Sequence, residues 1–285
     1  MIARALDARS TLWEILMSKP FAPRLASTAA AFATAGIALA AASTAQAQTI
    51  AALVNGSSLV WIDAKAKKVT GSVDLSGGAK VVGIDVRPAD KMLYGLTQDG
   101  AIVTIDAKTG TWTKKSQLTE KLPAGATFAV DFNPAADRMR VIGSDGTSLR
   151  INVEDGKTIV DGKLRFADTD ANKGTAPRVT AAGYTNSVAG TKETTLYDID
   201  AANGVLVRQA PPNDGILNTI GSLGVKVSGP VSFDIVTDGQ GGNAAWMVMG
   251  DTLYGIDLAT GGAKPHGKIA GLKGTVSDIA ILPAM

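Results

Sequence analysis

Hydrophobic and polar residues alternate with a period of two in short runs along most of the chain, and turn-forming residues separate these runs. The clearest stretch is 81–110, where alternating runs at 82–86, 92–96 and 102–105 are divided or followed by turn segments at 87–90, 98–100 and 108–110. Alternation interrupted by Pro, Asp and Gly roughly every 8–12 residues is typical of an antiparallel β-meander.

The same pattern recurs along the chain with a period in the forties. An Ile followed by Asp or Asn and then a turn occurs at Ile62, Ile105, Ile151, Ile199 and Ile256. Successive members of this series are 43, 46, 48 and 57 residues apart. A second series runs in phase with the first and places an Asp in an apolar context at 84–86, 130–132, 233–235 and 278–280. Units of this length that consist of four short strands are typical of β-propeller blades.

The two ends of the pattern predict a closed ring. After residue 48 the pattern starts in the middle of a unit, with strand-like runs at 50–54, 59–63 and 69–75, and residues 276–282 supply the missing first strand. A composite blade of this kind leaves no open sheet edge where the ring closes.

We therefore predict an all-β fold, a five-bladed β-propeller with four-stranded blades. The predicted blades are 49–75 with 275–283, 81–118, 127–166, 178–223 and 229–269. Six blades are the alternative, and they would require an additional unit inside the longer region 164–230. No segment after residue 47 keeps a 3.6-residue period long enough to predict a helix.

Residues 17–47 have the features of a Sec-type secretory signal peptide. Lys19 and Arg24 precede an apolar, Ala-rich run at 27–42, and Ala45-Gln46-Ala47 fits an A-x-A cleavage site. We expect cleavage after Ala47 and a periplasmic or secreted protein. The alternative is an uncleaved membrane anchor, for which the apolar run is short.

The signal peptide also sets the predicted domain organisation. Met17 is a better start for a signal peptide than Met1, so we interpret residues 1–16 as an upstream extension. Residues 1–47 are then the extension with the cleaved signal peptide, and residues 48–285 form a single β-propeller domain.

Composition narrows the classes of function. Of 28 basic and 26 acidic residues, the first 47 positions hold four and two, so residues 48–285 carry 24 of each. Nucleic-acid binding, which needs a clustered basic surface, is therefore not expected. The absence of cysteine excludes disulfides and thiolate chemistry. We expect a monomer that has no contact with the membrane once the signal peptide is cleaved.

Side chains suited to catalysis are sparse. His266 is the only histidine, and residues 48–285 contain three glutamates, so neither a Ser/His/Asp triad nor a multi-histidine metal site is predicted. The aspartates that follow the recurring isoleucines, such as Asp106 and Asp257, are interpreted as turn residues whose carboxylates accept backbone N–H groups. A ring of carboxylates that binds cations is the alternative interpretation of this series.

Two segments depart from the repeat, and such departures are where function is expected on a regular scaffold. In the first, 166–174, Asp168, Asp170 and Asn172 alternate and offer oxygen ligands of the kind that Ca²⁺ prefers. The loop is not an EF-hand, because its glycine is displaced by one residue and no glutamate follows. The alternative is an Asx-rich turn without a metal. The second segment, 208–219, inserts about ten residues around a rigid Pro-Pro-Asn-Asp-Gly turn.

Several motifs resemble those of the bacterial family named domain of unknown function 4394. They are 131–141, 149–152, 184–187, 195–200 and 211–219, and the resemblance extends over about residues 50–282. It implies an exported bacterial protein with a propeller-like repeat and no established activity. The polar members of these motifs are candidate ligand-binding residues, although each could equally cap a turn or bond two blades: Asn133, Arg138, Arg140, Asn186, Asn213, Asp214 and Asn218.

These observations favour an exported, non-enzymatic propeller that binds a small molecule or a protein or cell-envelope partner, with Ca²⁺ as a candidate stabilising ion. The alternative, by analogy of fold, is a metal-dependent lactonase-like or a quinoprotein-like enzyme. A lactonase-like site would need a central ring of Asp, Glu and Asn around a metal. A quinoprotein would repeat a tryptophan after each Gly turn, and only Trp112 fits that position.

Overall fold

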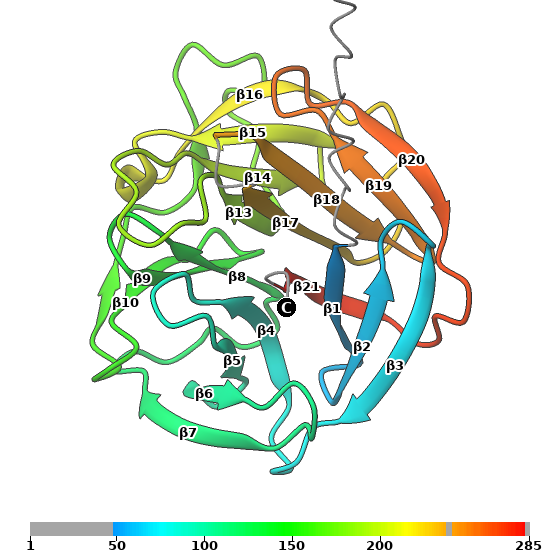
Figure 1. Cartoon of the computed structure of the whole chain (residues 1–285). Coiled ribbons are helices and arrows are strands. Elements are labelled where there is room, and N and C mark those ends of the chain that lie inside the picture. Colours follow the sequence, from blue (N-terminus) through cyan, green and yellow to red (C-terminus); the bar gives the residue numbers. More distant parts are fainter. Residues whose placement is uncertain (1–47, 238–240, 283–285) are drawn as a thin grey trace, which may run out of the picture. The chain divides into compact units, whose positions relative to one another are not determined.

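The computed structural model describes residues 48–237 and 241–282, which form five small antiparallel sheets around a common centre (Figure 1). This arrangement is a five-bladed β-propeller and confirms the predicted fold class. The predicted signal peptide and its cleavage site after Ala47 lie outside the described residues. Within the described part, the single helical element is a 3₁₀ turn at Pro212–Asp214, and no helix could cross a membrane.

Blade 1 joins the two ends of the described chain, which confirms the predicted composite blade. From the centre outward its strands are β21 (Val276–Ile281), β1 (Thr49–Val54), β2 (Ser58–Asp63) and β3 (Lys68–Asp74). Blade 2 consists of β4 (Val81–Val86), β5 (Leu93–Thr97), β6 (Ala101–Ile105) and β7 (Trp112–Gln117). Blade 3 consists of β8 (Phe128–Asn133), β9 (Arg138–Gly143), β10 (Ser148–Ile151) and β11 (Thr158–Val160).

Blade 4 has a fifth strand. Its order from the centre is β13 (Val179–Tyr184), β14 (Leu196–Asp200), β15 (Val205–Gln209), β16 (Ile216–Ser222) and β12 (Arg165–Phe166). Blade 5 consists of β17 (Val231–Thr237), β18 (Asn243–Met249), β19 (Thr252–Ile256) and β20 (Ala263–Lys268).

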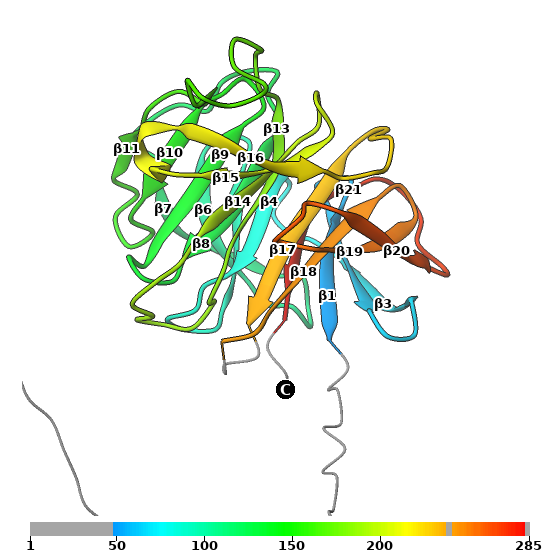
Figure 2. The same cartoon turned by 90° about the horizontal axis from the view of Figure 1, so that it is seen from above.

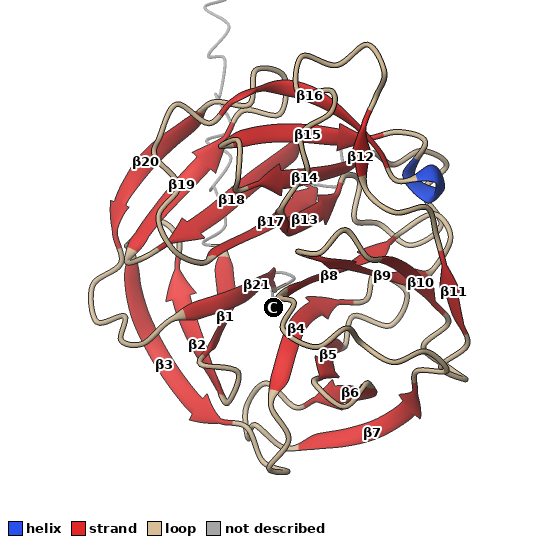
Figure 3. Ribbon diagram, turned by 180° about the vertical axis from the view of Figure 1, so that it is seen from behind, coloured by secondary structure: helices blue, strands red, loops and turns tan. Residues whose placement is uncertain are grey.

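The short strand β12 corrects the predicted end of the third blade. The chain leaves blade 3 after β11 and runs along the outer edge of blade 4, where β12 pairs in parallel with β16 (Figure 3). The backbone N–H groups of Arg165 and Ala167 donate to the carbonyls of Gly215 and Leu217, both at 2.9 Å. The predicted unit 127–166 was therefore too long, because the free edge of β16 offers hydrogen-bond partners to residues 165–167.

Hydrophobic side chains fill the spaces between neighbouring blades. The innermost strands β4, β8, β13, β17 and β21 lie next to one another around the centre (Figures 1 and 2). Both faces of the inner strands of each blade are therefore buried. For example, Tyr94 of blade 2 meets Phe132 of blade 3 edge to face, with ring centroids 5.3 Å apart. The outermost strands of blades 1, 2 and 5 are mostly exposed and polar, as expected for the rim of a propeller.

Four of the five innermost strands carry a buried aspartate that bonds to the inner strand of the next blade. We call this set the inner aspartates: Asp85, Asp131, Asp234 and Asp278. One oxygen of each accepts a backbone N–H across the blade boundary, from Phe132 (2.7 Å), Tyr184 (3.2 Å), Ile281 (2.6 Å) and Ile84 (3.0 Å), in that order. In Asp85, Asp234 and Asp278 the other oxygen accepts the N–H of the following residue.

Blade 4 departs from this arrangement. The pairing register shifts between Val81 and Gly83 in β4 and between Val179 and Ala181 in β13, which places Gly183 at the position that Asp85 holds in blade 2. A Cβ atom at Gly183 would lie 3.1–3.2 Å from side-chain carbons of Ile235 and Phe233 in blade 5. The glycine therefore allows blades 4 and 5 to approach closely through apolar contacts.

Burial raises the pKa of all four inner aspartates, and that of Asp234 reaches about 6. Repulsion between these carboxylates adds to the increase for Asp85, Asp131 and Asp278. Hydrogen bonds from backbone N–H groups to these carboxylates lower their pKa, because such bonds favour the charged form.

The first prediction concerns the contact between blades 2 and 3. Gly156 has a φ of +74°, and a Cβ atom there would clash with the carbonyl oxygen of Gln117. Gly125 has a similar φ of +80° with nothing within 4 Å of its Cβ position, so Gly125→Ala measures backbone strain alone, about 1 kcal/mol. We expect Gly156→Ala to lower the free energy of unfolding in urea by clearly more than this control does. Equal losses would contradict a tight blade contact at this point.

The second prediction concerns pH. The folded state holds protons on the inner aspartates at a pH where the unfolded chain has released them. Their contribution to stability is therefore complete below the ordinary carboxyl pKa of about 4 and is lost as the pH rises through the raised pKa of each group, which is about 6 for Asp234. For protein kept in EDTA, we expect the free energy of unfolding to fall less steeply between pH 4.5 and 7 in Asp234→Asn than in the wild type. Asp106→Asn, in an exposed turn, is the control, and an unchanged slope in Asp234→Asn would contradict this assignment.

Candidate functional site

Three of the inner aspartates converge at the centre of the propeller. Asp85, Asp131 and Asp234 come from blades 2, 3 and 5, and each offers a carboxylate oxygen that lies within 4.8 Å of the other two. Ca²⁺ binds oxygens at about 2.3–2.6 Å, so ligands on opposite sides of one ion lie roughly 5 Å apart. The spacing and the chemistry of these side chains therefore fit a hard cation.

Sequence reasoning did not include these residues among the candidate ligands. The signal was the second repeated series, which places Asp85, Asp131, Asp234 and Asp278 in phase in four repeat units. An Asp in an alternating strand does not reveal which blade its side chain faces. Convergence at one point becomes visible only when the ring is closed and the innermost strands meet.

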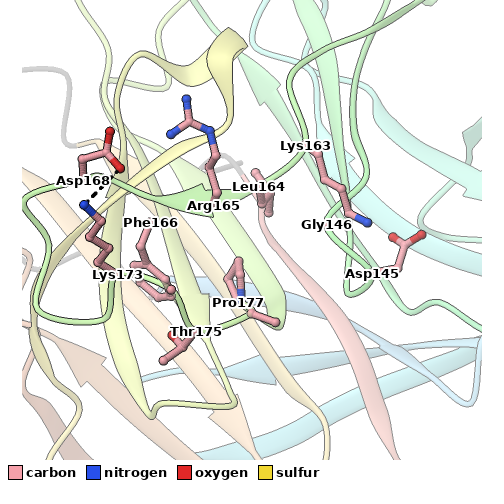
Figure 4. A pocket seen from close by; sticks show the side chains of 12 residues that line it. Asp145, Gly146, Lys163, Leu164, Arg165, Phe166, Asp168, Lys173, Thr175 and Pro177 are labelled. Atoms are coloured by element: carbon pink, nitrogen blue, oxygen red, sulfur yellow. Dashed lines mark ion pairs between the residues drawn. The ribbon is translucent and has the colours of Figure 1, made fainter.

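A separate pocket of about 500 Å³ lies where blades 3 and 4 meet (Figure 4). The turn between β9 and β10 forms one wall, and the segment 163–177 forms the rest. Leu164 and Phe166 are buried and provide an apolar floor, whereas Lys163, Arg165 and Lys173 are exposed. This pocket is built mainly from the segment in which the four-stranded repeat is interrupted.

The three residues of the predicted calcium loop have different partners. Asp168 is exposed and lies 3.5 Å from the ammonium group of Lys173, beside the pocket. Asp170 accepts the N–H of Thr219 (2.6 Å), its hydroxyl (2.9 Å) and the N–H of Asn172 (2.8 Å). The Asn172 side chain donates to the Thr219 hydroxyl at 2.9 Å. Asp170 and Asn172 thus fasten the loop to β16, and calcium binding here stays a prediction.

The structure brings two candidate ligand-binding residues together in a polar network between blades 3 and 4, in which Arg140 is buried and Asn213 is exposed. Arg140 is 1 % exposed, and its guanidinium donates to the Asn213 side-chain oxygen (2.9 Å), which is 73 residues away in the chain. It also donates to Asp161 (2.5 Å), Ser148 (3.0 Å) and the Tyr184 hydroxyl (3.3 Å). Arg140 and Asn213 are therefore occupied with each other and with the protein.

Asp198 of β14 lies in the same blade interface and was not expected from the sequence. It is fully buried, and neither carboxyl oxygen has a hydrogen-bond partner within the described residues. The side-chain oxygen of Gln209 also has no hydrogen-bond partner within the described residues. Gln209 lies in β15, two residues after Val207, which pairs with Asp198. Burial raises the pKa of Asp198 well above its usual range, and the nearby Arg140 opposes this only in part. The sequence signal was an acid on the apolar face of an alternating strand.

The remaining candidate residues bond mainly to backbone groups near them. Asn133 caps the turn after β8, and Arg138 donates to the carbonyls of Ala136 and Asp137. The Asn186 side chain donates to the carbonyl of Glu193, and Asn186 and Asn243 exchange hydrogen bonds. The Asn218 side chain donates to the carbonyl of Ala210, and Asp214 is exposed in the 3₁₀ turn. Ligand binding by these residues stays a prediction.

Comparisons with known proteins bear on the family and the fold. Among solved structures, the chain resembles a protein of unknown function from Bacteroides thetaiotaomicron VPI-5482, with 14% identity over 84% of this chain and 67% of that chain and a TM-score of 0.50. A protein of unknown function from Bacteroides caccae matches with 15% identity, coverage of 79% and 73%, and a TM-score of 0.41. An auxiliary nutrient binding protein from Bacteroides ovatus ATCC 8483 matches with 17% identity, coverage of 69% and 56%, and a TM-score of 0.41.

At these identities the likeness to solved structures concerns the fold alone. No curated protein matches the sequence. The sequence model described as "Domain of unknown function (DUF4394)" matches residues 58–280, which is most of the chain. The chain therefore belongs to the family Domain of unknown function 4394.

Proposed function

We propose that this protein is an exported, non-enzymatic β-propeller that binds a small molecule in the pocket between blades 3 and 4. The observation that carries the proposal is that the pocket forms where the repeat breaks. The segment 163–177, which contains strand β12, is an addition to the four-stranded repeat, and it lines most of the cavity of about 500 Å³. Binding loops on a rigid sheet scaffold are the usual way in which such folds acquire a function.

Export is supported by the sequence of residues 17–47, which has the features of a secretory signal peptide. Cleavage after Ala47 would make Gln48 the first residue of the mature protein, one position before β1 begins. The cleaved chain would therefore lose no described strand.

The pocket proposal is tested by a thermal-shift screen at millimolar concentrations of small organic acids, sugars and phosphate esters. We expect at least one compound to raise the unfolding midpoint of the wild type, because a ligand that binds only the folded state stabilises it. Ala176→Trp places a large side chain at an exposed lining position and should abolish that shift. Ala202→Trp, in the exposed turn between β14 and β15, should retain it. A shift that survives Ala176→Trp would place binding elsewhere.

A second candidate function is that of a metal-dependent, lactonase-like enzyme, and the central carboxylates favour it. Asp85, Asp131 and Asp234 offer a hard cation three oxygens at a suitable spacing. A bound cation would relieve the repulsion that, in addition to burial, raises the pKa of Asp85 and of Asp131. Such an ion, when bound, would supply a Lewis acid. Among the described residues this cluster contains Asp alone, whereas a lactonase-like ring was expected to include Glu and Asn.

This alternative and the calcium-loop prediction are separated by one set of unfolding measurements with EDTA, Ca²⁺, Mg²⁺ or Mn²⁺. If the central cluster binds the ion, a metal should raise the midpoint at pH 7.5 and do so less at pH 5, where protons compete for the same carboxylates. Asp131→Asn should remove the shift and Asp168→Asn should not. The opposite result assigns the ion to the loop 166–174, and identical midpoints in EDTA and in every metal exclude both sites.

A further inference from the structure

We infer that the ligand of the pocket between blades 3 and 4 is a small organic anion, with a carboxylate, sulfonate or phosphate group beside an apolar body. This inference rests on the proposed function of the pocket and names the class of its ligand. It follows from the charges around the pocket, from the way its cations are held and from the nature of its floor.

Two acids line the pocket, Asp145 and Asp168, and each already has a partner within the protein. Asp145 accepts the N–H of Thr147 (3.1 Å) and its hydroxyl (3.0 Å) within its own turn, and Asp168 lies beside Lys173 (Figure 4). Lys163 and Arg165 form no ion pair within residues 48–237 and 241–282. Two cationic side chains at the pocket thus remain available to an anion.

The backbone that carries these two cations is fixed. Arg165 lies in β12, and its N–H donates to the carbonyl of Gly215 at 2.9 Å. The Gly162 N–H donates to the carbonyl of Asn213 at 2.9 Å, and the Leu164 N–H donates to the carbonyl of Gly146 at 3.0 Å. A fixed backbone sets the position from which each of these side chains extends, so less conformational freedom is lost on binding than for the same side chains on an unrestrained loop.

The side chains of this segment alternate. Lys163 and Arg165 are exposed, whereas Leu164 and Phe166 are 5 % and 4 % exposed and join the hydrophobic cluster between blades 3 and 4. Figure 4 shows Arg165 and Phe166 extending in opposite directions, so exposed cations and buried apolar side chains line different sides of the same cavity. An Arg fork binds planar oxyanions in a bidentate manner, and the floor favours an aromatic or branched body over a bare inorganic ion.

The test uses two fluorescent probes of similar shape, the aromatic sulfonate 8-anilino-1-naphthalenesulfonate and the neutral N-phenyl-1-naphthylamine, titrated into the folded protein. We expect the wild type to bind the sulfonate more tightly than the neutral probe. Lys163→Gln and Arg165→Gln should each weaken sulfonate binding roughly 3- to 10-fold and leave the neutral probe unchanged. Lys108→Gln, in an exposed turn of blade 2, is the matched control. Added salt should weaken binding of the sulfonate alone.

The outcomes separate this inference from the proposed function. If Ala176→Trp removes both probes but the two charge variants bind the sulfonate as the wild type does, the pocket binds ligands and the anion inference is wrong. If both probes persist in Ala176→Trp, they bind outside the pocket and both proposals fail. If the wild type binds neither probe, the anion inference is wrong, whereas the thermal-shift screen still decides whether the pocket binds another small molecule. Loss of the sulfonate alone in the charge variants supports the anionic ligand.

Discussion

Buried aspartates that accept backbone N–H groups from the next blade hold the centre of this propeller together. Separate blades share no backbone ladder, so their innermost strands can be joined only through side chains and packing. Asp278, Asp85 and Asp131 make this bond across three successive boundaries, and Asp234 makes it from blade 5 to blade 1. A buried N–H without a partner would cost about 1–3 kcal/mol, so these contacts offset a real penalty at the most crowded part of the fold. The cost is repulsion among carboxylates that are close together and removed from water.

This central arrangement limits where a ligand can bind. Three carboxylate oxygens within 4.8 Å of one another leave space at the centre for an ion and not for an organic molecule. A larger ligand would not fit between these three carboxylates. Blade 4 is the blade that departs most from the repeat, because Gly183 replaces the inner aspartate and β12 adds a fifth strand at the rim. The pocket lies beside that added strand.

The sequence was sufficient for the fold because the signals are local and repeated. Period-two alternation and a recurring Ile-Asp turn predicted the strands, and the partial unit at each end predicted how β21 completes blade 1. The loop at 166–174 was recognised as a departure, and its Asp168 and Lys173 do line the pocket. Strand β12 was missed because two residues carry no periodic signal, and its pairing depends on the free edge of β16. A bond between blades was an open alternative for Arg140 and Asn213, but their pairing and the burial of Asp198 could not be predicted, because an alternating strand does not show which neighbouring blade each of its faces meets.

The network around Arg140 also explains how the pocket is held. The Asp161 carboxylate accepts hydrogen bonds from Arg140 and from Arg150, which fixes the start of the segment that carries Lys163 and Arg165. Through Asn213, Arg140 also fixes the loop whose carbonyl accepts the Gly162 N–H.

Buried ion pairs of this type often contribute less to stability than apolar residues of the same size would. Here the ion pair fixes positions, because the Arg140 guanidinium holds Asp161, which precedes Gly162, and also Asn213, whose carbonyl accepts the Gly162 N–H. The pocket residues and the network around Arg140 therefore form one unit, in which Arg140 helps to fix the backbone that carries Lys163 and Arg165.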